Sequence, residues 1–152
     1  MIVYRICKTR YAKDLKGVGA RKYGARWNQP GFECLYTSES RALALLEFTV
    51  NTNINDIPRA LSIVTIDLGK AGMQELKEAQ LPGDWKSFPA PASTKKFGTL
   101  LLKAAKTAII KIPSSIIPNE FNYILNPLHA KHKSFKIIDI ADYAYDLRIK
   151  TS

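Results

Sequence analysis

Apolar and polar residues alternate in several short stretches of the chain, which is the spacing of a half-buried β-strand. The clearest stretch is residues 60–68, where Val64, Ile66 and Leu68 share one face. Alternation or a short apolar run also predicts strands at the following positions: residues 2–7, 32–37, 107–112 and 136–140. Strands therefore account for much of the expected core.

A different spacing predicts a helix over about residues 40–50. Leu43, Leu46 and Val50 recur at three- and four-residue intervals, so they share one face of a helix. The hydroxyl of Ser38 or Ser40 can cap its N-terminus. Glu47 lies on the same face, which makes this helix the most informative element of the pattern.

Two further helices are expected. Phe97, Leu100 and Leu101 are spaced to face the core of a helix that ends near Lys103, with Ser93 or Thr94 as its cap. A short helix is also predicted at residues 73–79.

Glycine and proline mark the expected loops. Residues 15–31 contain four glycines, residues 81–92 contain three prolines, and residues 117–132 are interrupted by proline and asparagine. Helices and strands are mixed without regular βαβ alternation. We therefore expect residues 1–152 to form one α+β domain, compact and with a mixed β-sheet core.

The composition fits that expectation. At 152 residues, with 46% hydrophobic and 24% charged residues, the chain can bury roughly 70% of its unfolded surface. No apolar run approaches the ~20 residues that span a bilayer. The N-terminal residues lack the features of a secretory signal, so we expect a cytoplasmic protein without a membrane contact. Cys7 and Cys34 are then expected to be reduced and buried.

The net charge of +10 is the unusual global property. Basic surfaces attract phosphates, so nucleic acid, a phosphorylated small molecule and an acidic protein are candidate partners. The lysines form separate short groups rather than one basic tail, and no nucleic-acid-binding motif accompanies them. The alternative is that these lysines only solvate the surface.

Glu47 is the strongest candidate for chemistry. A carboxylate on an apolar helix face costs several kcal/mol unless it is paired, hydrogen-bonded or open to a cleft. Arg26 and Trp27 lie in the glycine-rich loop, where a guanidinium could bind a phosphate or carboxylate. Tyr36 ends the strand before the Glu47 helix. For each, a structural role is the alternative: an ion pair, a solvated cation and a core aromatic.

A metal site is not expected. His129 and His132 are three residues apart, but no cysteine or carboxylate cluster completes a ligand set. The sequence also lacks a nucleophile elbow, a phosphate-binding loop and a dinucleotide-binding glycine motif.

Several motifs, in a fixed order, resemble the RES domain family, which is named for an arginine, a glutamate and a serine. In the N-terminal half these motifs are Tyr4-Arg5-Ile6, Gly17-Val18-Gly19-Ala20, Gly24-Ala25-Arg26-Trp27-Asn28, Leu35-Tyr36-Thr37-Ser38 and Ala42-Leu43-Ala44-Leu45-Leu46-Glu47. In the C-terminal half they include Ile112-Pro113-Ser114, Pro118-Asn119-Glu120-Phe121-Asn122-Tyr123, Leu125-Asn126-Pro127-Leu128-His129 and Asp146-Leu147-Arg148. Two positions depart from the family pattern: Ala25 replaces a glycine and Ala130 replaces a proline.

The resemblance implies a fold similar to ADP-ribosyltransferases and places the family arginine, tyrosine and glutamate on Arg26, Tyr36 and Glu47. It places the serine on Ser134, with Ser114 as a competing match. As substrate-binding residues it suggests Ser134, Arg5, Trp27 and Asn126.

The resemblance also implies an activity. RES proteins are typically toxins of bacterial toxin–antitoxin pairs, neutralised by an Xre-type antitoxin, and their characterised substrate is NAD+. It implies that NAD+ is a substrate rather than a cofactor and that DNA is reached only through the antitoxin. A homodimer is left open. Water, phosphate or a protein side chain could accept the ADP-ribosyl group, and a non-enzymatic basic module remains the alternative from a different class.

Overall fold

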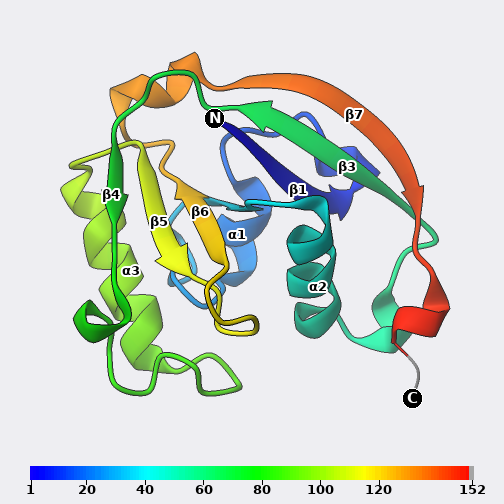
Figure 1. Ribbon diagram of the computed structural model, residues 1–152, viewed down its shortest axis with the longest axis horizontal. Helices are drawn as coiled ribbons and strands as arrows, with labels where there is room; N and C mark the ends of the chain where they lie inside the picture. Colours follow the sequence, from blue (N-terminus) through cyan, green and yellow to red (C-terminus); the bar gives the residue numbers. More distant parts are fainter. Residues whose placement is uncertain (151–152) are drawn as a thin grey trace.

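Seven strands form one sheet in the computed structural model, which describes residues 1–150 (Figure 1). In space their order is β4–β5–β6–β2–β1–β3–β7. Their bounds are Ile2–Lys8 for β1, Leu35–Ser38 for β2, Ala60–Asp67 for β3, Met73–Glu75 for β4, Ile109–Pro113 for β5, Phe121–Leu125 for β6 and Lys136–Ala144 for β7. In this sheet β4 and β5 are parallel, and the other neighbours are antiparallel. The expected α+β fold with a mixed sheet is therefore confirmed.

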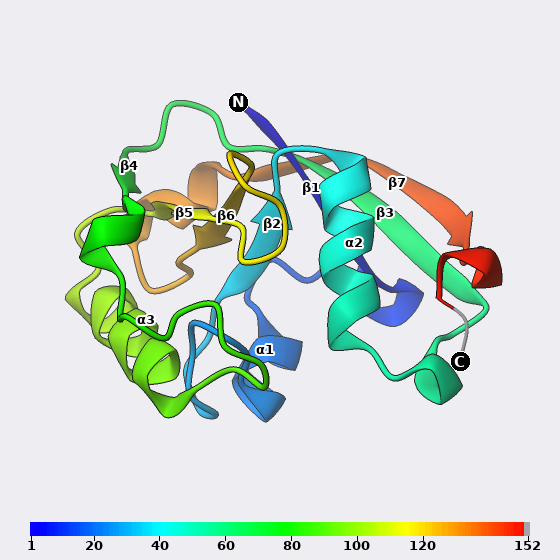
Figure 2. The same ribbon diagram turned by 60° about the horizontal axis from the view of Figure 1, so that its bottom comes forward.

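The sheet divides at its centre. β1 pairs with β3 along its whole length, but it pairs with β2 only at Tyr4 and Ser38. Figure 2 shows the two strands diverging from that point. The sheet thus consists of two halves, β4–β5–β6–β2 and β1–β3–β7, joined at a narrow place.

Three α-helices lie in the described residues: α1 (Val18–Tyr23), α2 (Arg41–Asn51) and α3 (Ala92–Ala104). Short 3-10 helices occur at Thr9–Tyr11, Ile54–Asp56, Glu78–Gln80, Ala130–Ser134 and Leu147–Ile149. The Ser40 side chain accepts a hydrogen bond from the Leu43 amide at 3.0 Å, which confirms the predicted cap of α2. Within residues 1–150 no helix has the length and apolar character needed to cross a membrane.

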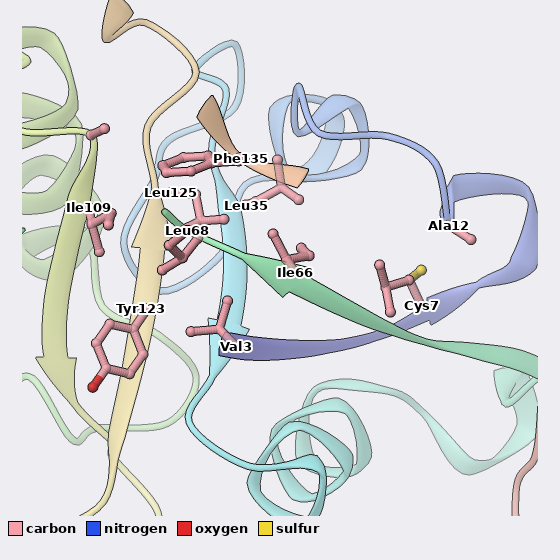
Figure 3. Close-up of a cluster of buried hydrophobic side chains, with 12 residues drawn as sticks. Val3, Cys7, Ala12, Leu35, Ile66, Leu68, Ile109, Tyr123, Leu125 and Phe135 are labelled. Atoms are coloured by element: carbon pink, nitrogen blue, oxygen red, sulfur yellow. The ribbon is translucent and has the colours of Figure 1, made fainter. Parts of the chain in front are cut away.

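Buried side chains form three clusters on the two halves of the sheet. One cluster joins β1, β3 and β6 and is shown in Figure 3, with Val3, Ile66 and Leu125 among its members. A second covers the β5–β6 half and includes Trp27, Trp85 and residues of α3. The third lies beneath α2, around Ile6 and Ala44. Helices α2 and α3 are therefore each fixed by contacts with a different apolar cluster.

Three elements differ from the sequence prediction. Residues 73–79 are not a helix, because Met73–Glu75 pairs with β5 as β4. Residues 117–132 are not wholly irregular, because Phe121–Leu125 forms β6. α1 lies within the predicted glycine-rich loop: Gly17 and Gly24 have positive φ and bound a helix at its two ends. In each case tertiary pairing or helix termination explains what the local pattern left ambiguous.

Smaller corrections concern α2 and α3. The N-cap of α3 is Pro91 rather than Ser93 or Thr94. Leu100 and Val50 are exposed instead of facing the core. The core side of α3 is formed by Leu102 together with the partly buried Phe97 and Leu101.

Both cysteines are buried and free, as the sequence predicts. Burial raises the pKa of the Cys34 thiol to about 12, although a hydrogen bond with Tyr36 opposes the shift. A thiol in that state is poorly nucleophilic, so the cysteines serve as apolar packing groups.

Gly98 permits the close approach of α3 to the Trp27 backbone. A methyl group at this position would collide with the Trp27 carbonyl. We expect Gly98→Ala to destabilise the fold by about 2 kcal/mol or more, although alanine has a higher helix propensity than glycine. Urea unfolding measures the change.

Gly19→Ala is the matched control, since Gly19 also lies in a helix and nothing approaches its added methyl group. This variant should be neutral or slightly stabilising. Equal free energies of unfolding for the two variants would refute the close approach.

Candidate active site

A pocket of about 350 Å³ opens where β1 and β2 diverge. Its walls come from these two strands, from α2, from residues 24–27 and from the segments after Pro89 and Ile112. Of the predicted site residues, the following line it: Arg5, Arg26, Trp27, Tyr36 and Glu47. The structure thus gathers residues from distant parts of the sequence into one cavity.

Glu47 projects from α2 into this pocket and has two side-chain partners. Its Oε1 accepts hydrogen bonds from Ser114 Oγ at 2.9 Å and from Asn122 Nδ2 at 2.6 Å. Its Oε2 accepts no hydrogen bond from residues 1–150. One oxygen is therefore anchored, while the other is available to a ligand.

Ser114 is buried and immediately follows β5. Besides donating to Glu47, its hydroxyl accepts hydrogen bonds from the amides of Ile116 and Ile117 at 3.1 and 3.2 Å. These contacts fix the hydroxyl and direct its proton toward the carboxylate. Glu47 is consequently held by hydrogen bonds, rather than by the ion pair considered as its structural alternative.

Arg26 lines the pocket from residues 24–27. Its Nη1 donates to the carbonyl oxygens of Trp85 and Ser87, both at 2.8 Å. Partial burial lowers the pKa of Arg26, while the negative charge of Glu47 opposes that shift. A guanidinium has further N–H groups, so Arg26 can tether this loop and still bind an anion.

Tyr36 holds the arginine segment in place. Its hydroxyl donates to Asn28 Oδ1 at 2.6 Å and accepts from the Trp27 amide at 3.0 Å. Asn28 is fully buried, and its Nδ2 donates to the carbonyls of Ala20 and Phe32. Burial raises the pKa of Tyr36 well above its usual value. The tyrosine therefore remains protonated and acts as a hydrogen-bonded support beside the pocket.

Cations outnumber carboxylates in the pocket. Arg5, Arg26 and Lys95 line it, and Glu47 is the one carboxylate among the described residues that does so. Arg5 Nη1 donates to the carbonyls of Tyr11 and Asp14, which hold the guanidinium on the β1 side. Such a pocket favours a ligand with negative charge at one end and a developing positive charge near Glu47.

The structure does not bring the other two predicted residues to this pocket. Ser134 lies on the surface and donates to the Lys131 carbonyl at 2.7 Å. Asn126 is buried, where it joins the end of β6 to the Leu102 carbonyl of α3. Of the two serines matched by the resemblance, Ser114 is the one beside Glu47.

Several pocket residues were not singled out from the sequence. Asn122 contacts Glu47 because β6 pairs with β2, and Lys95 reaches the pocket from the first turn of α3. Neither has a local signal, since both depend on contacts distant in sequence. Ala25 has no positive φ, so its replacement of a glycine leaves the loop unstrained.

The described part of the chain offers no evident set of ligands for a metal ion. Residues 1–150 contain no group of three or more His, Cys, Asp or Glu that could hold a metal ion. The chemical groups present are instead one carboxylate with a free oxygen, two serine hydroxyls in its vicinity and three cations. They can bind an anionic ligand and stabilise a cationic transition state.

Comparison with known proteins identifies the family of this chain. Residues 2–148 match the RES domain family. The protein named Toxin Res from Yersinia enterocolitica is 34% identical over 99% of this chain and 100% of its own length. The Prs ADP-ribosylating toxin of a Sphingobium species is 34% identical over 93% of this chain and 90% of its own.

The fold is also similar to a chain of the MbcT–MbcA toxin–antitoxin complex from M. tuberculosis. That chain is 17% identical, with a TM-score of 0.70 over 94% of this chain and 84% of its own. The structural match supports the fold, and the sequence matches span nearly the whole domain. The chain therefore belongs to the RES domain family.

Proposed function

We propose that this protein is the toxin of a bacterial toxin–antitoxin pair and that it cleaves the nicotinamide–ribose bond of NAD+. The observation that carries the proposal is the pocket itself. Glu47 presents one unoccupied carboxylate oxygen, while Arg5, Arg26 and Lys95 line the same cavity. NAD+ has the complementary charges, a pyrophosphate and a positively charged nicotinamide ribosyl group.

The chemistry needs one carboxylate. Breaking the bond between ribose C1 and the nicotinamide nitrogen passes through an oxocarbenium-like state, as glycoside hydrolysis does. The bonding electrons leave with nicotinamide, which becomes neutral and requires no general acid. Glu47 Oε2 would stabilise the positive charge on the ribose and bind its hydroxyl groups.

The remaining residues have supporting roles in this proposal. Arg26 and Lys95 bind the pyrophosphate, with Arg5 contributing positive charge from β1. Tyr36 supports the arginine loop and packs at the nicotinamide-ribose end. Ser114 takes the role expected of the family serine, because it contacts Glu47 whereas Ser134 is distant from the pocket.

The same comparisons support an antitoxin partner. Relatives along the whole chain carry the name Toxin Res, and the structural neighbour is part of a toxin–antitoxin complex. We propose an Xre-type antitoxin that blocks the pocket, with DNA contacted only through that partner. NAD+ is the substrate, and no further cofactor is required.

The acceptor distinguishes two candidate activities. Attack of water on ribose C1 yields ADP-ribose and releases a proton, while attack of phosphate yields the ribosyl phosphate. Both reactions deplete NAD+, and together they are the activity that we prefer. The second candidate is ADP-ribosyl transfer to a protein, which the name of the Sphingobium relative favours.

Purified protein incubated with NAD+ tests the proposal. We expect nicotinamide release, with ADP-ribose or its phosphate as the second product. Labelled ADP-ribose on a protein from an added extract would instead identify a transferase. No release under any of these conditions would refute cleavage of NAD+.

Glu47→Gln should lower kcat by about 100-fold or more, because the amide keeps the shape but loses the charge that stabilises the transition state. Nicotinamide release measures the effect, and relief of toxicity in cells gives a second readout. A non-enzymatic basic module predicts the reverse pattern, in which this variant stays toxic and lysine neutralisation abolishes function.

Lys95→Gln should raise the KM for NAD+ about 3- to 10-fold with little change in kcat. A cation that binds the pyrophosphate interacts equally with substrate and transition state, so its loss weakens binding alone. Lys96→Gln is the matched control, since Lys96 is exposed and does not line the pocket. Equal KM values for the two variants would exclude Lys95 from substrate binding.

A further inference from the structure

We propose that Asn122 is a positioning residue that holds the Glu47 carboxylate turned with Oε2 toward the pocket. The reaction it serves is the proposed NAD+ cleavage, so the kinetic part of this inference rests on that function. The contact itself rests on geometry alone. Asn122 Nδ2 donates to Glu47 Oε1 at 2.6 Å, which is the shorter of that oxygen's two hydrogen bonds.

A second hydrogen bond fixes Asn122. Ser38 Oγ donates to Asn122 Oδ1 at 2.7 Å. Ser38 and Asn122 are directly opposite each other on β2 and β6, and Ser38 is 3% exposed. Ser38 is also the residue of β2 that pairs with Tyr4 of β1. The hydrogen-bonded series Ser38–Asn122–Glu47 therefore begins where the sheet divides and ends in the pocket.

The polarity of this series depends on the charge of Glu47. An ionised carboxylate only accepts hydrogen bonds, so the amide of Asn122 must present Nδ2 to it. Oδ1 then faces Ser38, whose hydroxyl can donate. Ser114 Oγ and Asn122 Nδ2 both act as donors to the same carboxylate oxygen. The arrangement suits a group that must be negative throughout the reaction.

The series also determines which oxygen is free. Ser114 and Asn122 both contact Oε1, and they approach it from the ends of different strands, β5 and β6. A single donor would leave the carboxylate free to rotate about its last side-chain bond. Two donors on one oxygen fix that rotation and leave Oε2 toward the cavity.

Asn122→Asp is the sharpest test. The substitution keeps the shape and the Ser38 contact but places a second carboxylate against Glu47, so the pair retains a proton near neutral pH. We expect kcat/KM about 100-fold below the wild type at pH 6–7, with the deficit narrowing as the pH rises to 9. A constant fraction of wild-type activity across this range would overturn the inference.

Asn51→Asp controls for added charge. Asn51 lines the same pocket but has no contact with the Glu47 carboxylate. This variant should keep the wild-type shape of the pH profile. An identical pH-dependent loss in both aspartate variants would show that pocket charge, and not the contact with Glu47, causes the effect.

A double-mutant cycle tests the contact without substrate. Asn122→Ala, Glu47→Gln and the double variant are unfolded in urea without NAD+, and non-additive free energies are expected for residues in direct contact. Additive effects would overturn the contact. If the wild type releases no nicotinamide, the proposed function fails while this cycle still decides whether Asn122 holds the carboxylate.

Discussion

The pocket depends on one constraint: a carboxylate on the inner side of a helix needs hydrogen-bond donors. The donors are Ser114, which follows β5, and Asn122, which lies on β6. These two hydrogen bonds join α2 to the β4–β5–β6–β2 half of the sheet. The same contacts occupy one carboxylate oxygen and leave the other without a hydrogen bond from the described residues. Stability and chemistry therefore have the same requirement at Glu47.

The part of the pocket around Arg26 and Trp27 is organised by neutral groups rather than by charge. Tyr36 and the buried Asn28 hold the backbone around Trp27, and Gly98 lets α3 approach that backbone closely. Arg26 is thereby fixed at its Cα while its guanidinium spans the loop at Trp85. A cation held in this way loses little freedom when an anion binds, which favours affinity.

The sequence predicted those parts of the molecule whose signals are local. α2, its serine cap and the position of Glu47 followed from periodicity, and so did five of the strands. Arg26 and Tyr36 had no distinctive local pattern, because their contacts join segments 8 to 61 residues apart. Only the family resemblance grouped them with Glu47.

Other features depend on strand pairing, which local pattern cannot supply. The segment that forms β4 was predicted as a helix. It is a strand because its pairing with β5 outweighs its own propensity. β6 was obscured by the prolines and asparagines that mark its ends. The register of β6 on β2 then determines that Asn122 meets both Ser38 and Glu47. Sequence matching left both Ser114 and Ser134 as the family serine, whereas in the structure Ser114 contacts Glu47 and Ser134 donates to the Lys131 carbonyl.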